Sequence, residues 1–302
     1  MKIGFGVPVS GSWATPANML LVARRAEELG YDSLWTFQRL LYPVGNPMGP
    51  VYRSVQDPIV TLSFLAGVTS RVRLGLAVVN MPFYSPALLA KQLASLQDVS
   101  GGRLDAGLGL GWLPEEFVAS GVPMEGRGRR AVEYLQVLRR LWTEEIISHK
   151  GEFYEIPPSY QDPKPRPAPP PVLLGGTAEV ALRRAGQLAD GWISSSRADL
   201  TSIRDQIYIV KDAARAAGRD PGALRFIVRG VTRLREAGLP DRRPLTGSPE
   251  EIRSDVEALA AAGVTEVFHD LNFDPDISSP DADPAASLRR AEEALDALAP
   301  GE

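Results

Sequence analysis

The sequence predicts an α/β protein built as a single (β/α)8 barrel, because eight short apolar runs alternate with longer stretches of helical period. The length of 302 residues is typical of one such barrel, and a hydrophobic content of 44% is enough to bury its core. We therefore expect residues 1–302 to form one domain. An open, doubly wound sheet is the alternative architecture that the same alternation allows.

Each predicted strand is a short run rich in apolar and β-branched residues, with turn-forming residues on both sides. The carboxyl ends of parallel barrel strands meet on one face, where the active sites of this architecture are built. Side chains at the strand ends are therefore candidate site residues. In chain order the predicted strands are Lys2–Val9, Tyr31–Phe37, Val72–Asn80, Leu104–Gly111, Val172–Gly175, Gly191–Ser195, Arg225–Leu234 and Thr265–Phe273.

The helices between the strands carry start and stop signals. A Ser, Thr or Asp before a proline supplies an N-cap side chain, and proline is tolerated at the first helical position because its missing N–H would have no partner there. Glycines such as Gly30 and Gly263 stand where a helix should end in a left-handed residue. The capping pairs are Thr15-Pro16, Asp57-Pro58, Ser85-Pro86, Asp220-Pro221, Ser248-Pro249 and Asp283-Pro284.

The longest departure from the repeat is an insertion at about 144–171, EEIISHKGEFYEIPPSYQDPKPRPAPPP, between the fourth helix and the fifth strand. We expect a short hairpin followed by extended, proline-rich backbone. Two interpretations remain open for this segment. It is a stiff connector, or else Phe153, Tyr154 or Tyr160 covers the mouth of the barrel.

Composition and charge exclude several classes of function. A net charge of -4, with basic and acidic residues interspersed, gives no electrostatic footprint for nucleic acid or for an anionic membrane. The absence of cysteine excludes disulfides and thiolate catalysis, so redox chemistry would need a borrowed cofactor. The N-terminus MKIGFGVPVSGSW has the features of neither a signal peptide nor a spanning segment. We expect a cytoplasmic protein.

The first candidate motif, GLGLGW at 107–112, closes the fourth predicted strand. It is not a G-x-G-x-x-G fingerprint, because Trp112 takes the place of the third glycine, so a nicotinamide site of the Rossmann type is disfavoured. Alternating glycines remove side chains from one face of a strand. Either neighbouring strands pack closely there, or a flat ligand lies against the backbone.

The second candidate motif is the turn Gly175-Gly176-Thr177, between the fifth strand and the following helix. Free backbone N–H groups and the positive end of a helix converge at such a turn, which suits a phosphate. The competing interpretation is an ordinary turn that is capped by Thr177. Thr246-Gly247-Ser248, after the seventh strand, is a rival anion site, and the spacing of the sequence does not decide between them.

The two histidines give neither a metal pattern nor a triad. His149 lies in the insertion and His269 near the end of the eighth strand, so they lack zinc-like spacing and we predict no metal site. His269-Asp270 is not accompanied by a G-x-S-x-G elbow, which favours a packed or solvent-facing histidine. The pairs Arg183-Arg184 and Arg289-Arg290 are predicted to lie on solvated helix faces.

Four longer segments carry a family resemblance: SRVRLGLAVVNMPFYSPALLAKQLASLQDVSGGRLDAGLGLGW (70–112), RRAVEYLQVLRRLWTEE (129–145), GEFYEIPP (151–158) and PVLLGGTAEVALRRAGQLADGW (171–192). Together they resemble the bacterial luciferase-like monooxygenase superfamily. Within it they look most similar to the actinobacterial oxidoreductases that use coenzyme F420, an 8-hydroxy-5-deazaflavin. The resemblance spans roughly 1–263 and implies a barrel that binds its cofactor in the mouth.

The resemblance also implies where the cofactor ring would lie. The ring would rest against a non-prolyl cis peptide bond, which here would join Ala77 and Val78. Gly109 and Gly111 would let the ring and its ribityl chain approach the fourth strand. The cofactor phosphate would lie on the turn of Gly175, Gly176 and Thr177, which favours this turn over the rival anion site.

Side chains beside the ring are implied in the same way. Asn80 and Trp112 would border it, and Asn80 could hydrogen-bond the substrate. Related deazaflavin dehydrogenases carry an Asp-His pair at the end of the second strand, whereas this sequence has Gln38-Arg39 there. Arginine is a poor proton shuttle but a good electrostatic clamp for a carboxylate, an enolate or the anionic deazaflavin. A structural salt bridge from Arg39 to Asp57 or Glu115 is the alternative.

Three functions are compatible with these residues. The first is an F420-dependent oxidoreductase that passes hydride between C5 of the cofactor and a small-molecule substrate. The second is an FMN-dependent monooxygenase with a reductase partner, and the third is a non-catalytic flavin- or deazaflavin-binding barrel. The missing histidine makes oxidation of a hydroxyl group less favoured than hydride addition to a polarised double bond. A homodimer through the apolar helix Asp57–Ser70 is expected from relatives.

Overall fold

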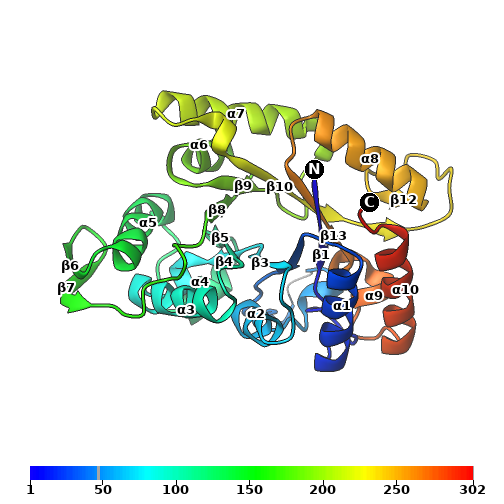
Figure 1. Ribbon diagram of the computed structural model, residues 1–302, viewed down its shortest axis with the longest axis horizontal. Helices are drawn as coiled ribbons and strands as arrows, with labels where there is room; N and C mark the ends of the chain where they lie inside the picture. The colour runs from blue at the N-terminus through cyan, green and yellow to red at the C-terminus, as the bar shows by residue number, and fades with distance from the viewer. Residues whose placement is uncertain (46–47, 302) are drawn as a thin grey trace.

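Parallel strands close into a ring at the centre of the computed structural model, which describes residues 1–45 and 48–301 (Figure 1). The order around the ring is β3, β2, β1, β13, β10, β9, β8 and β5, and pairing of β3 with β5 closes it. The predicted (β/α)8 barrel is therefore confirmed, and the open sheet is excluded. The strands are β1 Lys2–Gly6, β2 Ser33–Thr36, β3 Arg73–Leu76, β4 Val79–Asn80, β5 Leu104–Gly109, β8 Val172–Gly175, β9 Gly191–Ile193, β10 Arg225–Val231 and β13 Glu266–Asp270.

Helices surround the ring of strands (Figure 1). Side-chain caps form at the predicted starts, since Thr15, Asp57, Ser85, Ser248 and Asp283 each accept a hydrogen bond from a backbone N–H of the first turn. The α-helices are α1 Pro16–Glu28, α2 Pro58–Ala66, α3 Pro86–Val99, α4 Pro114–Ala119, α5 Arg127–Thr143, α6 Glu179–Leu188, α7 Ile203–Ala216, α8 Pro249–Ala261, α9 Pro275–Ser278 and α10 Pro284–Ala297. Short 3-10 helices lie at Pro50–Tyr52, Met81–Phe83, Leu200–Ser202, Pro221–Ala223 and Leu271–Phe273.

Three predicted strands divide or end early. The strand predicted at 72–80 is divided at Ala77-Val78, where the peptide bond is cis. The strand predicted at 225–234 is divided at Thr232, after which β11 (Arg233–Leu234) pairs with β12 (Thr246–Gly247) in a separate sheet. The strand predicted at 265–273 gives way to a 3-10 helix after Asp270. Each change lies near the carboxyl end of its strand, where the chain leaves the barrel.

The insertion forms an antiparallel hairpin of β6 (Ile146–Lys150) and β7 (Glu155–Tyr160), which projects beside α5 (Figure 1). Polar contacts hold the hairpin and the segment after it against α5, on the outside of the barrel. His149 Nε2 lies 3.0 Å from Glu133 Oε1 of α5, and Lys164 donates to the backbone oxygens at the end of that helix. None of the three aromatic residues proposed to cover the mouth lines the cavity described below. The structure thus agrees with a connector.

The barrel interior holds a small apolar cluster and, beneath it, a layer of charges. Trp35 and Phe268 stack with their ring centroids 5.1 Å apart, and they pack with Leu173, Ile193 and Ile227. These side chains fill the barrel axis below the mouth. The barrel is therefore a packed core and not a pore.

The charged layer lies at the amino ends of the strands. Asp105 is fully buried and receives paired hydrogen bonds from Arg73 (3.0 and 2.6 Å) and from Arg225 (2.6 and 3.0 Å). Arg225 also donates to Glu266 Oε2 at 2.9 Å, and Ser33 Oγ donates to Glu266 Oε1 at 2.5 Å. Burial alone would raise the pKa of the Asp105 carboxyl, but the hydrogen bonds from the two arginines outweigh it and hold that pKa below its ordinary value.

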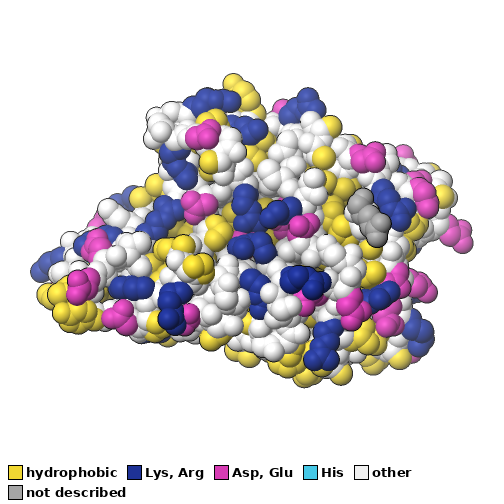
Figure 2. Space-filling model, in the orientation of Figure 1, with side chains coloured by type: hydrophobic (Ala, Val, Ile, Leu, Met, Phe, Trp, Pro, Cys, Tyr) yellow, Lys and Arg dark blue, Asp and Glu magenta, His cyan; other side chains and the backbone are white. Residues whose placement is uncertain are grey.

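The surface carries mixed charge, with basic and acidic side chains interspersed over the face shown in Figure 2. Within residues 1–45 and 48–301, no helix is long and apolar enough to cross a bilayer. Helix α2 is apolar on both faces, so that Val60 is 69% and Phe64 is 41% exposed. The expected homodimer through this helix stays a prediction.

Candidate functional site

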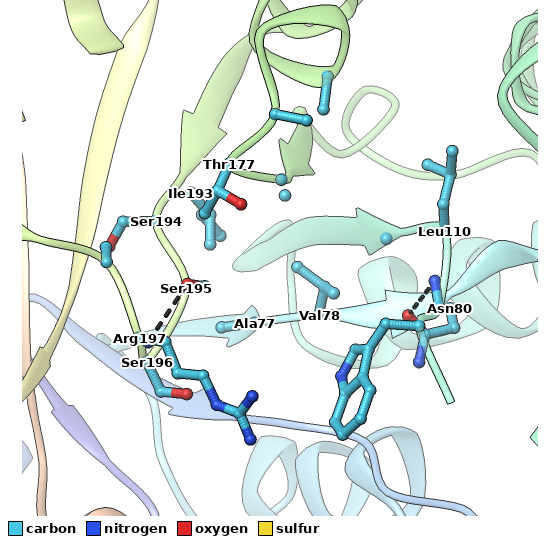
Figure 3. Close-up of a pocket in the computed structure, with 18 of the residues that line it drawn as sticks. Ala77, Val78, Asn80, Leu110, Thr177, Ile193, Ser194, Ser195, Ser196 and Arg197 are labelled. Atoms are coloured by element: carbon cyan, nitrogen blue, oxygen red, sulfur yellow. Dashed lines mark hydrogen bonds between the residues drawn. The ribbon is translucent and has the colours of Figure 1, made fainter. Parts of the chain in front are cut away.

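A cavity of about 770 Å³ opens at the carboxyl ends of the barrel strands (Figure 3). Its wall is built from the ends of β2, β4, β5, β8, β9 and β10 and from the segments that follow them. The sequence-predicted residues that it brings together are Gln38, Arg39, Ala77, Val78, Asn80, Gly109, Gly111, Trp112, Gly175, Gly176 and Thr177. All the predicted site residues therefore lie in one wall, whereas their roles stay predictions.

The cis bond between Ala77 and Val78 lies at the centre of this wall, as the resemblance implies (Figure 3). The carbonyl oxygen of Ala77 accepts a hydrogen bond of 3.0 Å from Arg229 Nη1. Arg229 is buried, is paired with Asp270 at 2.7 Å and lies over the rings of Phe37 and Phe273. Its charge is thus compensated within the barrel.

The glycines of the wall make room for protein atoms, which modifies the interpretation made from the sequence. A Cβ at Gly109 would overlap the side chain of Val78, and a Cβ at Gly175 would lie 3.2 Å from it. The Val78 side chain fills the space that these glycines leave. A flat ligand would therefore meet Val78, instead of the bare backbone of the fourth strand. Gly111 has φ +73°, a left-handed conformation that favours glycine.

Gln38 and Asn80 form a chain of hydrogen bonds across three strand ends. Gln38 Oε1 accepts from the backbone N–H of Asn80 at 2.9 Å, and Gln38 Nε2 donates to the Tyr84 hydroxyl at 2.8 Å. Asn80 Oδ1 in turn accepts from the backbone N–H of Gly111 at 3.0 Å (Figure 3). Both ends of the Gln38 amide are engaged, so Gln38 positions Asn80. The Asn80 amide nitrogen can therefore donate hydrogen bonds to a ligand in the cavity.

Arg39 makes a buried ion pair, but with a partner other than the two predicted ones. Its Nη1 lies 3.0 Å from Oε1 of Glu116, and the two side chains are 5% and 1% exposed. Asp57 and Glu115 are not its partners. The Nε and Nη1 atoms of Arg39 have no hydrogen-bond acceptor among the described residues, so the contact with Glu116 is Coulombic without hydrogen-bond geometry. The Arg39 guanidinium also lies 4.7 Å from the centroid of the Trp112 ring.

The turn after β8 forms what we call the cationic end of the cavity, which comprises Gly175, Gly176, Thr177, Arg127 and Arg184. The N-cap of α6 is Ala178, so Thr177 does not cap the helix as the ordinary-turn interpretation supposed, and no side chain bonds its first N–H groups. The Gly176 carbonyl accepts from Trp192 Nε1 at 2.8 Å, which fixes the turn. Uncapped N–H groups at a helix start attract anions.

Two arginines face each other at the cationic end. Arg127 begins α5, and Arg184 approaches it closely enough that a Cβ on Gly128 would lie 2.8 Å from Arg184 Nη2. Within residues 1–45 and 48–301, neither guanidinium has a carboxylate within the 4.0 Å of a salt bridge. Burial lowers the pKa of Arg184, and the charge of Arg127 lowers it further. An anion placed between them would relieve this repulsion.

The rival anion site at Thr246-Gly247-Ser248 is already satisfied by the protein. Ser248 caps α8 in a capping box, in which its backbone N–H donates to Glu251 Oε2 at 2.9 Å. The Ser248 hydroxyl donates to Glu250 Oε2 at 2.9 Å. Two carboxylates therefore stand where an anion would bind, and these residues do not line the cavity.

Sequence reasoning missed the other arginines of the wall. Arg184 was predicted to lie on a solvated helix face, and this is wrong: it lines the cavity, while its neighbour Arg183 pairs with Glu179 and Asp212 on the surface. Arg229 could have been found as a charge inside an apolar strand. Arg197 carried no signal, because it lies in the loop after β9.

His269 takes no part in the cavity. It is fully buried, and its Nδ1 lies 3.0 Å from the Thr232 hydroxyl. His149 pairs with Glu133 outside the barrel. In the described part of the chain, no three His, Asp or Glu side chains are grouped as metal ligands.

We expect His269 to make the protein less stable in acid. Burial lowers its pKa from the ordinary 6.5 to about 4, so the unfolded chain binds this proton more tightly than the folded one. Its contribution to stability is complete above pH 6.5 and is lost as the pH falls toward 4, by about 3 kcal/mol. Denaturant unfolding of wild type and His269→Asn across this range should show the wild-type stability falling more steeply. Parallel curves would contradict the prediction.

Comparisons with known proteins identify a family and several relatives. A family model described as luciferase-like monooxygenase matches residues 3–238. An uncharacterised protein of Mycobacterium tuberculosis is 33% identical over 294 residues, 93% of this chain and 95% of the relative. An F420-dependent glucose-6-phosphate dehydrogenase of Amycolatopsis mediterranei is 29% identical over 72% of this chain and 64% of the relative. The pyrimidine monooxygenase RutA of Allorhizobium ampelinum is 29% identical over 75% and 66%.

Solved structures share the fold. The monooxygenase RslO1 from Streptomyces bottropensis aligns with a TM-score of 0.79 at 24% identity and covers 99% of this chain and 98% of that one. An F420-dependent secondary alcohol dehydrogenase aligns with a TM-score of 0.78 at 18% identity and covers 98% of both chains. The expected resemblance is confirmed by the family model and by relatives that use F420. This chain belongs to the luciferase-like monooxygenase family.

Proposed function

We propose that the protein is a cytoplasmic oxidoreductase that binds coenzyme F420 in the cavity and transfers hydride between C5 of the cofactor and a small organic substrate. Relatives named above use F420 or are monooxygenases, and the choice between these chemistries is our inference. The cationic end of the cavity carries the proposal. It combines two arginines that have no acidic partner among the described residues, the uncapped start of α6 and a glycine turn.

The cationic end fits the tail of this cofactor. F420 carries a phosphate followed by a carboxylate-bearing chain, and arginine matches both groups because its planar fork donates two parallel hydrogen bonds. Arg127 and Arg184 would share these charges, while the turn of Gly175, Gly176 and Thr177 would offer backbone N–H groups to the phosphate. The repulsion between the two arginines would then become a favourable interaction with the ligand.

The rest of the wall fits a flat ring. Val78 would support one side of it, with Asn80 and Trp112 at its border. When bound, the deazaflavin supplies a carbon that gives or takes hydride, and it disfavours stable oxygen adducts. The protein's part is then orientation and electrostatics.

The cavity wall offers mainly charge and hydrogen bonds, and no histidine is among its described lining residues. Among the described lining residues, the one carboxylate is that of Asp199, and it already accepts hydrogen bonds from the backbone N–H (3.0 Å) and hydroxyl (2.7 Å) of Thr201. Gln38 and Arg39 occupy the place where relatives are expected to hold Asp-His. A wall that has arginines and amides, and in which the carboxylate of Asp199 is already engaged, favours hydride addition to a polarised C=C, C=O or C=N bond.

An FMN-dependent monooxygenase with a separate reductase is the second candidate, because RutA and RslO1 are monooxygenases by name. Equilibrium titration of the purified protein with F420 and with FMN discriminates between the two. We expect a change in the deazaflavin spectrum on binding, with affinity for F420 at least about tenfold above that for FMN. Tight FMN binding with an unchanged deazaflavin spectrum would refute F420 dependence.

Turnover separates an enzyme from a passive cofactor carrier. Reduced F420 mixed with the protein should be oxidised only when an unsaturated or carbonyl substrate from a broad panel is present. Oxygen uptake with supplied reduced FMN would instead point to the monooxygenase. Binding of F420 without turnover on any substrate would leave a carrier as the function.

A further inference from the structure

The cavity has a second positively charged region, which is built from segments other than those of the cationic end. Arginines outnumber carboxylates among its lining residues, with Arg39, Arg127, Arg184, Arg197 and Arg229 against Asp199. Arg229 is compensated by Asp270, and two of the others belong to the cationic end. Arg39 and Arg197 remain, and both lie beside Trp112.

Arg197 is the accessible member of this pair. Its side chain projects into the cavity from the loop after β9 (Figure 3), with its guanidinium 5.5 Å from the centroid of the Trp112 ring. The backbone N–H of Arg197 donates to Ser195 Oγ at 3.2 Å, which fixes the loop without engaging the guanidinium. In the part of the chain that the structure describes, this guanidinium has no carboxylate within the 4.0 Å of a salt bridge.

Arg39 is the buried member, and its guanidinium lies 4.7 Å from the centroid of the same ring. Glu116 is its acidic partner, but Glu116 Oε1 also accepts from the backbone N–H groups of Leu40 (2.7 Å) and Leu41 (3.2 Å). The Arg39 Nε and Nη1 atoms have no acceptor among the described residues. Because Glu116 Oε1 is already hydrogen-bonded by two backbone N–H groups, it compensates the Arg39 charge only in part, and low exposure strengthens the remaining positive potential.

We propose that the substrate is an organic acid whose carboxylate binds Arg197 beside Trp112, with Arg39 contributing to the field. This inference rests on the proposed function, because it assigns the cationic end to the cofactor and the Arg39–Trp112–Arg197 cluster to the substrate. A carboxylate suits Arg197 because two of its N–H groups can donate in parallel, while Trp112 offers an apolar face to the carbon skeleton. Arg197 is then a specificity-determining residue.

Trp112 reports on this cluster directly. It is 46% exposed, whereas Trp13, Trp35, Trp142 and Trp192 are at most 3% exposed. Collisional quenching of tryptophan fluorescence by acrylamide therefore measures the solvent access of Trp112 in the purified, cofactor-free protein. We expect benzoate to protect Trp112 from acrylamide and its neutral analogue benzamide to protect it at least about tenfold more weakly, because charged hydrogen bonds are the stronger ones.

Variants of Arg197 test whether this residue is the one that binds benzoate. Arg197→Gln should weaken benzoate protection about tenfold or more, and Arg197→Lys should restore part of it, because a point charge replaces the fork. The matched control is Arg204→Gln, at an exposed arginine of α7 that does not line the cavity, and it should leave protection unchanged. Since Arg197 is exposed, its substitution should not alter the thermal unfolding curve.

Several results would overturn the proposal. The first is equal protection of Trp112 by benzoate and benzamide. The second is that none of acetate, succinate and benzoate protects it. The third is an Arg197→Gln protein that keeps wild-type protection. Protection by inorganic phosphate but not by benzoate would overturn the assignment to carboxylates. Because no cofactor is present, a protein that uses FMN would give the same quenching result. Failure of the proposed function and failure of this inference are therefore distinguishable.

Discussion

Replacing Asp105 with alanine is expected to lower the free energy of unfolding by about 3 to 5 kcal/mol, the cost of breaking a buried ion pair by removing one partner. Asp105 is fully buried and holds Arg73 and Arg225, which come from different strands. Without it, two guanidiniums remain at the amino end of the barrel, and of the two, Arg225 alone keeps an acidic partner among the described residues, Glu266. The loss exceeds that of the hydrogen bonds alone, because uncompensated charge remains.

Chemical denaturation followed by tryptophan fluorescence measures this effect. Glu152→Ala is the matched control, since Glu152 pairs with Arg129 at 2.9 Å on the surface, where the side chains are 60% and 73% exposed. Exposed pairs contribute less than about 1 kcal/mol, so this variant should unfold almost as the wild type does. A loss for Asp105→Ala as small as that of the control would mean that the charged layer does not hold the barrel closed.

The pH dependence of this layer follows from the lowered pKa of Asp105. A carboxyl whose folded pKa lies below its unfolded value stabilises the protein above the unfolded pKa and loses that contribution as the pH falls through the folded one. The contribution of Asp105 to stability is therefore lost at lower pH than that of His269. Acid unfolding should show His269 acting first and the charged layer later.

Local signals were enough to predict the barrel, for physical reasons. Proline after Ser, Thr or Asp fixes a helix start within one residue, as at Ser85 and Asp283, because the capping hydrogen bond and the proline ring are local constraints. Strand ends were less predictable. The division at Thr232 depends on the pairing of β11 with β12, a contact between segments that are not neighbours in sequence.

The site was predicted as far as strand ends determine it. Residues such as Gln38 and Thr177 follow from the rule that parallel strands deliver their carboxyl ends to one face, whereas Asn80 was implied by the resemblance. The partner of Arg39 did not follow, because adjacent residues of a helix point about 100° apart, and α4 turns Glu116 inward instead of Glu115. Periodicity alone could not tell which of the two carboxylates faces the barrel.

The arginines of helices and loops are a harder case. Arg183 and Arg184 are neighbours of the same type, yet one pairs on the surface and the other lines the cavity. Adjacent helix residues point about 100° apart, and Arg184 extends toward α5, where a Cβ on Gly128 would lie 2.8 Å from its Nη2. Such a contact joins residues that are distant in the sequence, so no local sequence pattern predicts it.

Replacing Arg184 with glutamine is expected to weaken cofactor binding about 10- to 100-fold, because a charged hydrogen bond to an anionic group contributes about 1.5 to 3 kcal/mol. The same change should leave stability within about 0.5 kcal/mol of wild type or raise it slightly. In the cofactor-free protein, Arg184 has no acidic partner in the described residues and is repelled by Arg127. A residue that lowers the stability of the cofactor-free protein and strengthens cofactor binding is typical of a binding site.

Titration with F420 and thermal unfolding of the same variants measure the two effects separately. Arg183→Gln is the matched control, because it removes the neighbouring arginine, which pairs with Glu179 at 2.8 Å and Asp212 at 3.4 Å outside the cavity. It should change the affinity for F420 little. Raising the salt concentration should weaken wild-type binding more than binding to Arg184→Gln, since screening acts on the charge that the variant lacks. Equal affinities for the two variants, or a fall in stability without a loss of affinity, would show that Arg184 is a structural residue and that the cofactor tail lies elsewhere.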